Sequence, residues 1–143
     1  MKTTLFSLIG LCFLGSCSPK LVQSPQSAGL VGGDKDSHGS IASAGYVWSE
    51  VQQDCIRLFE KGIRIEPVKG NNGSAFIVFS PDSARVELFF PNGQSNEILD
   101  RRNLPSGGHV WNVEDDDTKN VRFLNGVWTI SRRNKLIYKQ QVK

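Results

Sequence analysis

From residue 63 onward, apolar and polar residues alternate with a period of two, the period of a β-strand that buries one face. The alternation is clearest at residues 63–66 and 84–90, where Val86 and Leu88 share one face and Glu87 lies on the other. Turn sequences such as Pro91-Asn92-Gly93 and Asn125-Gly126 interrupt it. The pattern predicts antiparallel strands at residues 63–66, 75–79, 84–90, 97–99, 109–113, 121–124, 127–131 and 136–138.

Residues 50–61 show a different period, that of an amphipathic helix. Val51, Cys55, Leu58 and Phe59 recur at the spacing of one helical face. Ser49 and Gln52 fit the Ser-x-x-Gln capping box that starts helices, and a glycine follows residue 61 at the C-cap position. The sequence therefore predicts an α+β fold: one N-terminal amphipathic helix, with Cys55 on its buried face, followed by an antiparallel β-meander that forms a curled sheet or a small barrel.

The first 17 residues have the pattern of a secretory signal. A basic start precedes an apolar run that is shorter than the roughly 20 residues needed to cross a bilayer, and small residues follow. The last four residues, Leu14-Gly15-Ser16-Cys17, resemble the lipobox of bacterial lipoproteins. This resemblance implies that residues 1–16 are removed and that fatty acyl chains on Cys17 attach the protein to a membrane. By resemblance to Gram-negative lipoproteins, Ser18 after the cysteine implies the outer membrane, facing the periplasm.

The domain organisation follows from a change of composition near residue 45. Residues 17–44 are rich in Ser, Gly and Pro, and their sparse apolar residues show no period. Such a segment does not bury enough apolar surface to offset its ordering entropy. We therefore expect a lipidated cysteine and flexible tether over residues 17–44, and one globular domain over residues 45–143.

Charge and cysteine content narrow the chemistry. Seventeen basic and fourteen acidic residues give a net charge of +3 without a long basic block, so nucleic acid is not an expected partner. After removal of Cys12 and lipidation of Cys17, Cys55 is the one remaining thiol in the sequence. It supports neither an intrachain disulfide nor zinc binding. A buried free thiol and a disulfide to another chain both stay open.

The sequence lacks the motifs of a catalytic or metal site. It contains no Gly-x-Ser-x-Gly, His-Glu-x-x-His, phosphate-binding loop or dinucleotide fingerprint. The acidic run at residues 114–117 does not fit a calcium loop, because Lys119 occupies a ligand position and the required glycine is missing. We interpret it as a solvated turn, and we expect a protein without enzymatic activity, metal or cofactor.

Two segments carry candidate binding residues. Arg132, Arg133 and Lys135 lie near Trp128 and Tyr138, and arginine beside aromatic residues is typical of interfaces. The same charges also protect a terminal strand from edge pairing. The other segment contains Ser106-Gly107, followed by an aromatic residue.

These two segments resemble the binding elements of the membrane-bound inhibitors of C-type lysozyme. The resemblance implies that Ser106 and Gly107 hydrogen-bond the catalytic carboxylates of a lysozyme while Arg132 or Arg133 supplies positive charge. The chain departs from that family: Trp111 comes one position late, and the family's disulfide cannot form with Cys55 alone.

The sequence thus predicts an envelope lipoprotein whose small β domain binds a protein partner. Two alternatives stay open. One is a lysozyme inhibitor, and the other is a structural or assembly component of the envelope that is held to its partner through an exposed strand edge.

Overall fold

The computed structural model describes residues 34–70, 72–91, 93–114 and 117–142, all of which belong to one compact unit. The predicted signal segment, Cys17 and the first part of the predicted tether lie outside the described residues. Within the described ranges, no helix has the length and apolar character needed to cross a membrane.

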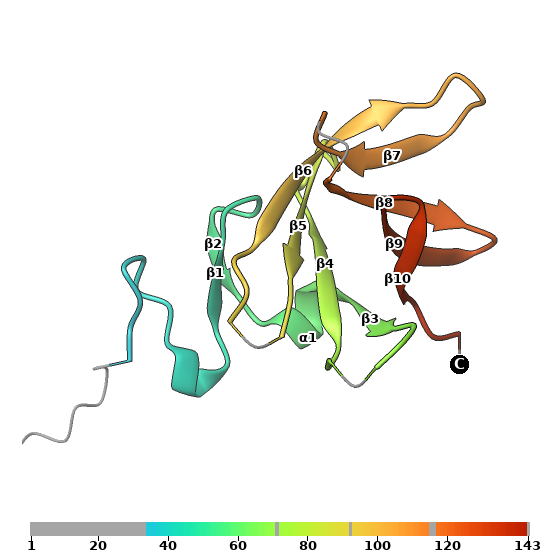
Figure 1. The fold of residues 1–143 in the computed structure, drawn as a ribbon. Coiled ribbons are helices and arrows are strands. Elements are labelled where there is room, and N and C mark those ends of the chain that lie inside the picture. Colours follow the sequence, from blue (N-terminus) through green and yellow to red (C-terminus); the bar gives the residue numbers. More distant parts are fainter. Residues whose placement is uncertain (1–33, 71, 92, 115–116, 143) are drawn as a thin grey trace, which may run out of the picture. The chain divides into compact units, whose positions relative to one another are not determined.

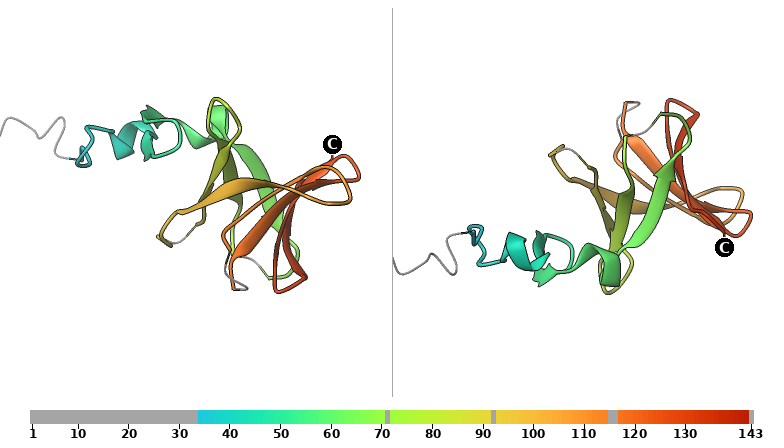
Figure 2. Two further views of the ribbon diagram at one scale, coloured as in Figure 1. Left: turned by 90° about the horizontal axis from the view of Figure 1, so that it is seen from above. Right: turned by 90° about the horizontal axis from the view of Figure 1, so that it is seen from below.

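Among the described residues, eight antiparallel strands form a closed barrel (Figure 1). Each strand pairs with the next one along the chain, and β10 closes the barrel by pairing with β3, as the two views in Figure 2 show. The strands are β3 (Ile63–Pro67), β4 (Ala75–Phe79), β5 (Arg85–Phe89), β6 (Glu97–Asn103), β7 (His109–Asn112), β8 (Lys119–Leu124), β9 (Val127–Arg132) and β10 (Lys135–Lys139). The predicted antiparallel strands are confirmed, and β6 is longer than expected.

The barrel interior is filled by alternate residues of these strands. Val86 and Leu88 on β5, and their counterparts on the other strands, are fully buried, as the period of two requires. The buried residues of this core are Ile65, Ala75, Ile77, Val86, Leu88, Leu99, Trp111, Val121, Ile130 and Tyr138. Burial of this apolar surface is the main force that holds the barrel closed.

The α+β prediction is wrong, because residues 50–61 do not form the expected amphipathic helix. Instead, β1 (Val47–Ser49) and β2 (Asp54–Ile56) form an antiparallel hairpin. Only a short α1 (Leu58–Lys61) and a 3₁₀ turn η1 (Ala42–Ala44) are helical in the described part of the chain. The protein is therefore a mostly β protein.

The local contacts of the predicted helix start explain this difference. The hydroxyl of Ser49 accepts a hydrogen bond from the backbone N–H of Gln52 at 3.3 Å, which is half of the predicted capping box. The side chain of Gln52, however, donates to the carbonyl of Phe79 on the barrel instead of returning to Ser49. Gln53 then adopts a φ of 52°, a left-handed conformation that ends the helical turn.

The β1–β2 hairpin gains more from packing on the barrel than a helix would gain from propensity. Val51 and Ile56 are buried against Val78 and Phe89, which are outward-facing residues of β4 and β5. A helix of about twelve residues is only marginally stable without such packing. Glu87 lies on the face of β5 opposite Val86 and Leu88, as the alternation predicts, and the hairpin covers this face, so Glu87 is only 1% exposed.

Residues 34–44, which belong to the predicted flexible tether, make defined contacts in the described part of the chain. Asp34 accepts a hydrogen bond from the backbone N–H of Ser43 at 2.7 Å, and the ring of His38 stacks on Trp48 with centroids 4.3 Å apart. Cys55 lies on β2 rather than on a helix; it is half-buried, free, and its sulfur contacts the hydroxyl of Ser40. The expectation that a helix buries Cys55 is thus also wrong.

Candidate functional site

The inward-facing residues of β8 and β9 are apolar in the middle of the barrel and positively charged at one end. Lys119 lies two residues before the buried Val121 on β8, and Arg132 lies two residues after the buried Ile130 on β9. Since residues two apart share a face of a strand, both cations lie on the inward-facing side of their strands. They lie at the side of the barrel that carries the β3–β4, β5–β6, β7–β8 and β9–β10 connections, hereafter the mouth.

A cavity of about 330 Å³ opens at the mouth. It has the size of a small binding site, and barrel mouths are common positions for such sites. Its wall combines positive charge with aromatic and aliphatic surface. The cations are Lys69, Lys119, Arg132 and Lys135, and the other lining residues are Pro67, Asn72, Phe90, Gln94, Leu136, Ile137 and Tyr138.

Three of these cations stand in register on neighbouring strands. Arg132 pairs with Lys119 on β8 and with Lys135 on β10, so it lies directly between two lysines. Like charges directly opposite each other destabilise a sheet. The row formed by Lys119, Arg132 and Lys135, hereafter the cation row, is therefore a cost to folding, which is typical of residues retained for binding.

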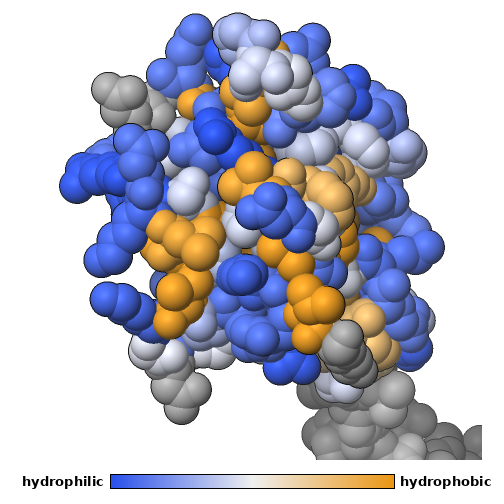
Figure 3. All heavy atoms as spheres, turned by 90° about the vertical axis from the view of Figure 1, so that its right-hand side faces the viewer, coloured by the Kyte–Doolittle hydropathy of each residue, from blue (hydrophilic) through white to orange (hydrophobic). Residues whose placement is uncertain are grey.

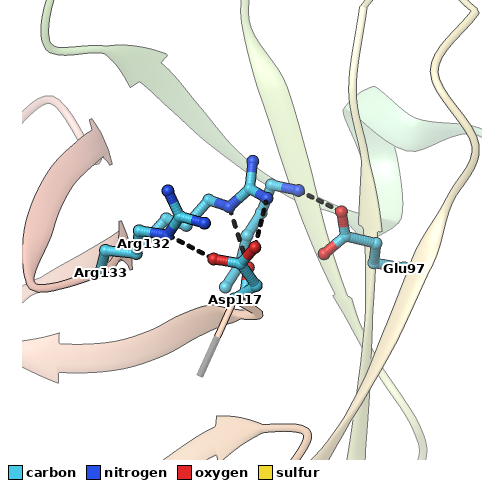
Figure 4. Close-up of polar contacts among 5 residues, drawn as sticks. Glu97, Asp117, Arg132 and Arg133 are labelled. Atoms are coloured by element: carbon cyan, nitrogen blue, oxygen red, sulfur yellow. Dashed lines mark hydrogen bonds and ion pairs between the residues drawn. The ribbon is translucent and has the colours of Figure 1, made fainter. Parts of the chain in front are cut away.

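Two carboxylates partly neutralise the cation row, as Figure 4 shows. Glu97 forms an ion pair with Lys119, and Asp117 from the β7–β8 loop forms ion pairs with Arg132 and Arg133. The Nε of Arg132 also donates to the backbone carbonyl of Asp117 at 2.9 Å. The hydrogen bond from Arg133 lowers the pKa of the Asp117 carboxyl below its ordinary value, and Asp117 in turn raises the pKa of Arg133.

The cations of the mouth differ in exposure. The side chain of Lys119 is only 14% exposed, whereas those of Arg132 and Arg133 are 50% and 70% exposed. The ammonium group of Lys119 lies 4.7 Å from the centroid of Phe90, a cation–π contact. The deeper cation is thus held in place, and the two arginines present their charge to the solvent.

Aromatic rings form the apolar wall of the mouth. The rings of Phe90 and Tyr138 lie 5.6 Å apart, measured between their centroids. Burial raises the pKa of the Tyr138 hydroxyl, so it stays protonated at neutral pH. The mouth can therefore take a group that combines negative charge with an apolar surface.

A second hollow, of about 560 Å³, lies on the outward face of β8, β9 and β10, hereafter the outer groove. None of the described residues that line it is a carboxylate, and Leu136 lines both the outer groove and the mouth. Figure 3 shows this side of the molecule, on which apolar residues form patches among hydrophilic ones. The lining residues are Asn120, Arg122, Leu124, Asn125, Val127, Thr129, Ser131, Asn134, Leu136, Lys139 and Val142.

The structure brings together the basic residues singled out in the sequence but not the Ser-Gly segment. Arg132, Arg133 and Lys135 lie at the mouth, at the β9–β10 turn. Ser106 and Gly107 are exposed in the β6–β7 loop. Because successive connections of an up-and-down meander alternate between the two ends of its strands, this loop lies at the end opposite the mouth.

The aromatic residue that follows the Ser-Gly segment belongs to the core. Trp111 is 6% exposed, and its ring lies 5.5 Å from that of Trp128. Its indole N–H donates to the carbonyl of Ser83 at 3.0 Å. Trp111 therefore fills the barrel at the end opposite the mouth, where it is not available to a partner.

Sequence reasoning missed Lys69, Lys119, Phe90 and Glu97 as parts of the site. The signal for Lys119 was present in the Asn125-Gly126 turn, since a two-residue turn fixes the register of a hairpin. Counting back from the turn on both strands places Lys119 opposite Arg132. No comparable signal exists for Lys69, which lies in the irregular β3–β4 connection.

Nothing in the described residues forms a metal site. No group of three or more His, Cys, Asp or Glu side chains lies close enough to hold an ion in this part of the chain. Within the acidic run, Asp117 binds arginine and Glu114 forms an ion pair with Arg102 at 3.6 Å. Asp115 and Asp116 lie outside the described residues.

Comparison with models of protein families, with curated proteins and with solved structures found no match.

Proposed function

We propose that the protein is a lipid-anchored binding protein of the bacterial cell envelope, without enzymatic activity, whose barrel mouth binds an acidic segment of a partner protein. The observation that carries this proposal is the cation row. Lys119, Arg132 and Lys135 lie side by side at a cost to the sheet, around a cavity with an aromatic wall. A carboxylate-bearing chain is the ligand that relieves this repulsion.

The geometry gives less support to the lysozyme-inhibitor alternative. That function needs the Ser-Gly loop and a basic residue to enter one acidic cleft. Ser106 and Gly107 belong to the end of the barrel opposite Arg132. A plate assay of lysozyme inhibition by the purified lipoprotein tests this alternative directly.

The alternative of an assembly component held through a strand edge also has little support. Closure gives every described barrel strand a partner on both sides, which removes edges available for strand addition. In the described part of the chain, open edges belong only to the short β1–β2 hairpin. A partner is therefore better accommodated by side chains at the mouth than by backbone pairing.

Attachment to the outer membrane through Cys17 is part of the proposal and rests on the lipobox-like sequence Leu14-Gly15-Ser16-Cys17. Cys17→Ser should abolish labelling by radioactive palmitate and release the protein from the membrane fraction. Continued labelling of this variant, or recovery of the native protein in inner-membrane vesicles, would contradict the corresponding part of the proposal.

The binding site is tested by crosslinking in intact envelopes, followed by mass spectrometry of the captured partner. A variant with Arg132→Gln, Arg133→Gln and Lys135→Gln should fold normally and lose the partner. The matched control replaces three exposed cations away from the mouth by glutamine: Lys61, Arg85 and Arg101. It removes the same charge and should retain the partner, while added salt should weaken capture by the native protein. Undiminished capture by the mouth variant would overturn the proposal.

A further inference from the structure

We infer that the segment bound at the mouth is an extended chain in which an acidic residue is followed by apolar residues, the acidic residue entering the mouth and the apolar residues lying in the outer groove. This inference rests on the proposed function, because it names the kind of segment that the same mouth takes.

The first support is that the two hollows adjoin. Leu136 lines the mouth on one side and the outer groove on the other, and it is 39% exposed. A chain that leaves the mouth over the β9–β10 turn therefore meets the outer groove directly. An isolated small anion would fill the mouth and would leave the outer groove without an occupant.

The second support is the composition of the outer groove. Its apolar members Leu124 and Val142 are 48% and 76% exposed, large values for residues of this kind. Exposed apolar residues that cluster beside a polar rim are typical of protein-binding surfaces. The charged members are Arg122 and Lys139, both positive. The outer groove thus suits an apolar segment with negative charge nearby, and it disfavours a basic one.

The third support is spacing. Leu124 lies five residues beyond Lys119 on β8, and a strand advances about 3.3 Å per residue, so Leu124 is about 17 Å along the strand from the cation row. An extended chain advances by the same distance per residue. About five residues therefore separate an acidic residue beside Lys119 from an apolar residue beside Leu124. This spacing is within the reach of a short linear segment, and it fixes the design of a probe.

The probe is a blocked peptide with two glutamates, two serines and then two leucines. One control peptide has serines in place of the leucines, and the other has glutamines in place of the glutamates. Binding to the detergent-solubilised full-length lipoprotein is measured by fluorescence anisotropy of a labelled peptide at low salt. We expect the complete peptide to bind at least tenfold more tightly than either control.

Two variants locate the apolar residues of the peptide. Leu136→Ser and Leu124→Ser change exposed side chains, so both variants should fold, which circular dichroism checks. Each should weaken binding of the complete peptide about fivefold, because part of a leucine contact is lost. Neither should alter binding of the peptide without leucines. Lys135→Gln should weaken both peptides.

Three results would overturn the inference. These are equal affinity for the peptides with and without leucines, no effect of either leucine variant, and a concentration-dependent dimer that excludes the peptide from the outer groove. Failure of the proposed function gives a different result, since the mouth variant would then keep its partner in the envelope. If the mouth variant lost that partner while both leucine variants bound the complete peptide normally, the inference would be wrong and the proposed function would stand.

Discussion

The hydroxyl of Ser49 donates a hydrogen bond of 2.7 Å to the carboxylate of Glu87, beneath the β1–β2 hairpin. Both residues are almost completely buried, at 0% and 1% exposure. The same carboxylate accepts hydrogen bonds from the side chain of Asn96 at 2.9 Å and from the backbone N–H of Val51 at 3.4 Å. One buried acidic group thus attaches both the hairpin and the β5–β6 connection to the barrel.

Replacement of Glu87 by alanine should lower the free energy of unfolding by about 2–4 kcal/mol. The change leaves the Ser49 hydroxyl and the backbone N–H of the buried Val51 without their acceptor, and each unsatisfied buried group costs about 1–3 kcal/mol. Urea unfolding of the purified protein measures the loss.

Arg85→Ala is the matched control for this experiment. Arg85 lies two residues from Glu87 on the same face of β5, but it is exposed. Its removal should change stability by less than about 0.5 kcal/mol. Equal urea midpoints for the two alanine variants would show that the Glu87 carboxylate does not stabilise the hairpin.

The burial of Glu87 marks the limit of what the sequence predicts. The alternation around Val86 and Leu88 correctly separates the inner from the outer face of β5. Whether an outer face meets solvent depends on what packs against it. The β1–β2 hairpin covers Glu87, and the periodicity of residues 50–61 favoured a helix in its place. Since tertiary packing decides between such alternatives, local propensity failed there.

More of the mouth than of the hairpin could be predicted from the sequence. Arg132, Arg133 and Lys135 stood out by composition, and the turn at Asn125-Gly126 fixed the register that adds Lys119. The aromatic wall was not predictable in this way. Phe90 directly follows β5 and Tyr138 lies on β10, and these segments, far apart in the sequence, meet only because β10 closes the barrel on β3.

The Asp117 carboxyl should titrate below the ordinary aspartate value of about 3.9. The largest cause of the lowered pKa is the hydrogen bond from Arg133, so Arg133→Gln should raise the titration midpoint of Asp117 towards the ordinary value. Because the folded state lowers this pKa, the ion pair stabilises the fold above the unfolded value. That contribution is lost as the pH falls through the folded value. Carboxyl chemical shifts in an NMR titration measure both midpoints.

Asp82 provides an internal control in the same titration. Its pKa is lowered by hydrogen bonds from Ser80 and from the backbone N–H of Ala84, which do not involve Arg133. Its midpoint should be the same in the native protein and in the variant. An Asp117 midpoint that does not respond to Arg133→Gln would exclude this ion pair as the cause.

Glu97→Gln should increase the affinity of the mouth for an acidic segment by up to about fivefold. Glu97 neutralises Lys119 in the free protein, and a bound carboxylate has to compete with it. Loss of a partly exposed ion pair corresponds to about 0.2–1 kcal/mol. The glutamate-serine-leucine peptide measures the change. Glu60→Gln removes the ion pair between Glu60 on α1 and Arg57, the residue before α1, and should leave the affinity unaltered. A lower affinity of the Glu97 variant would mean that Glu97 positions Lys119 for binding rather than competing for it.

Lys135→Glu should stabilise the fold while abolishing partner binding. Lys135 is exposed and lies directly opposite Arg132, so the change turns one repulsive cross-strand pair into an attractive pair. Such pairs differ by about 0.2–1 kcal/mol, and the urea midpoint should rise accordingly.

Lys139→Glu is the opposite test on the same strand. Lys139 lies opposite Glu66, so the same substitution creates repulsion there and should lower the midpoint. Added salt should shrink both effects. If both variants moved the midpoint in the same direction, cross-strand charge would not explain the change. The cation row would then not destabilise the fold, and the argument that it is retained for binding would fail.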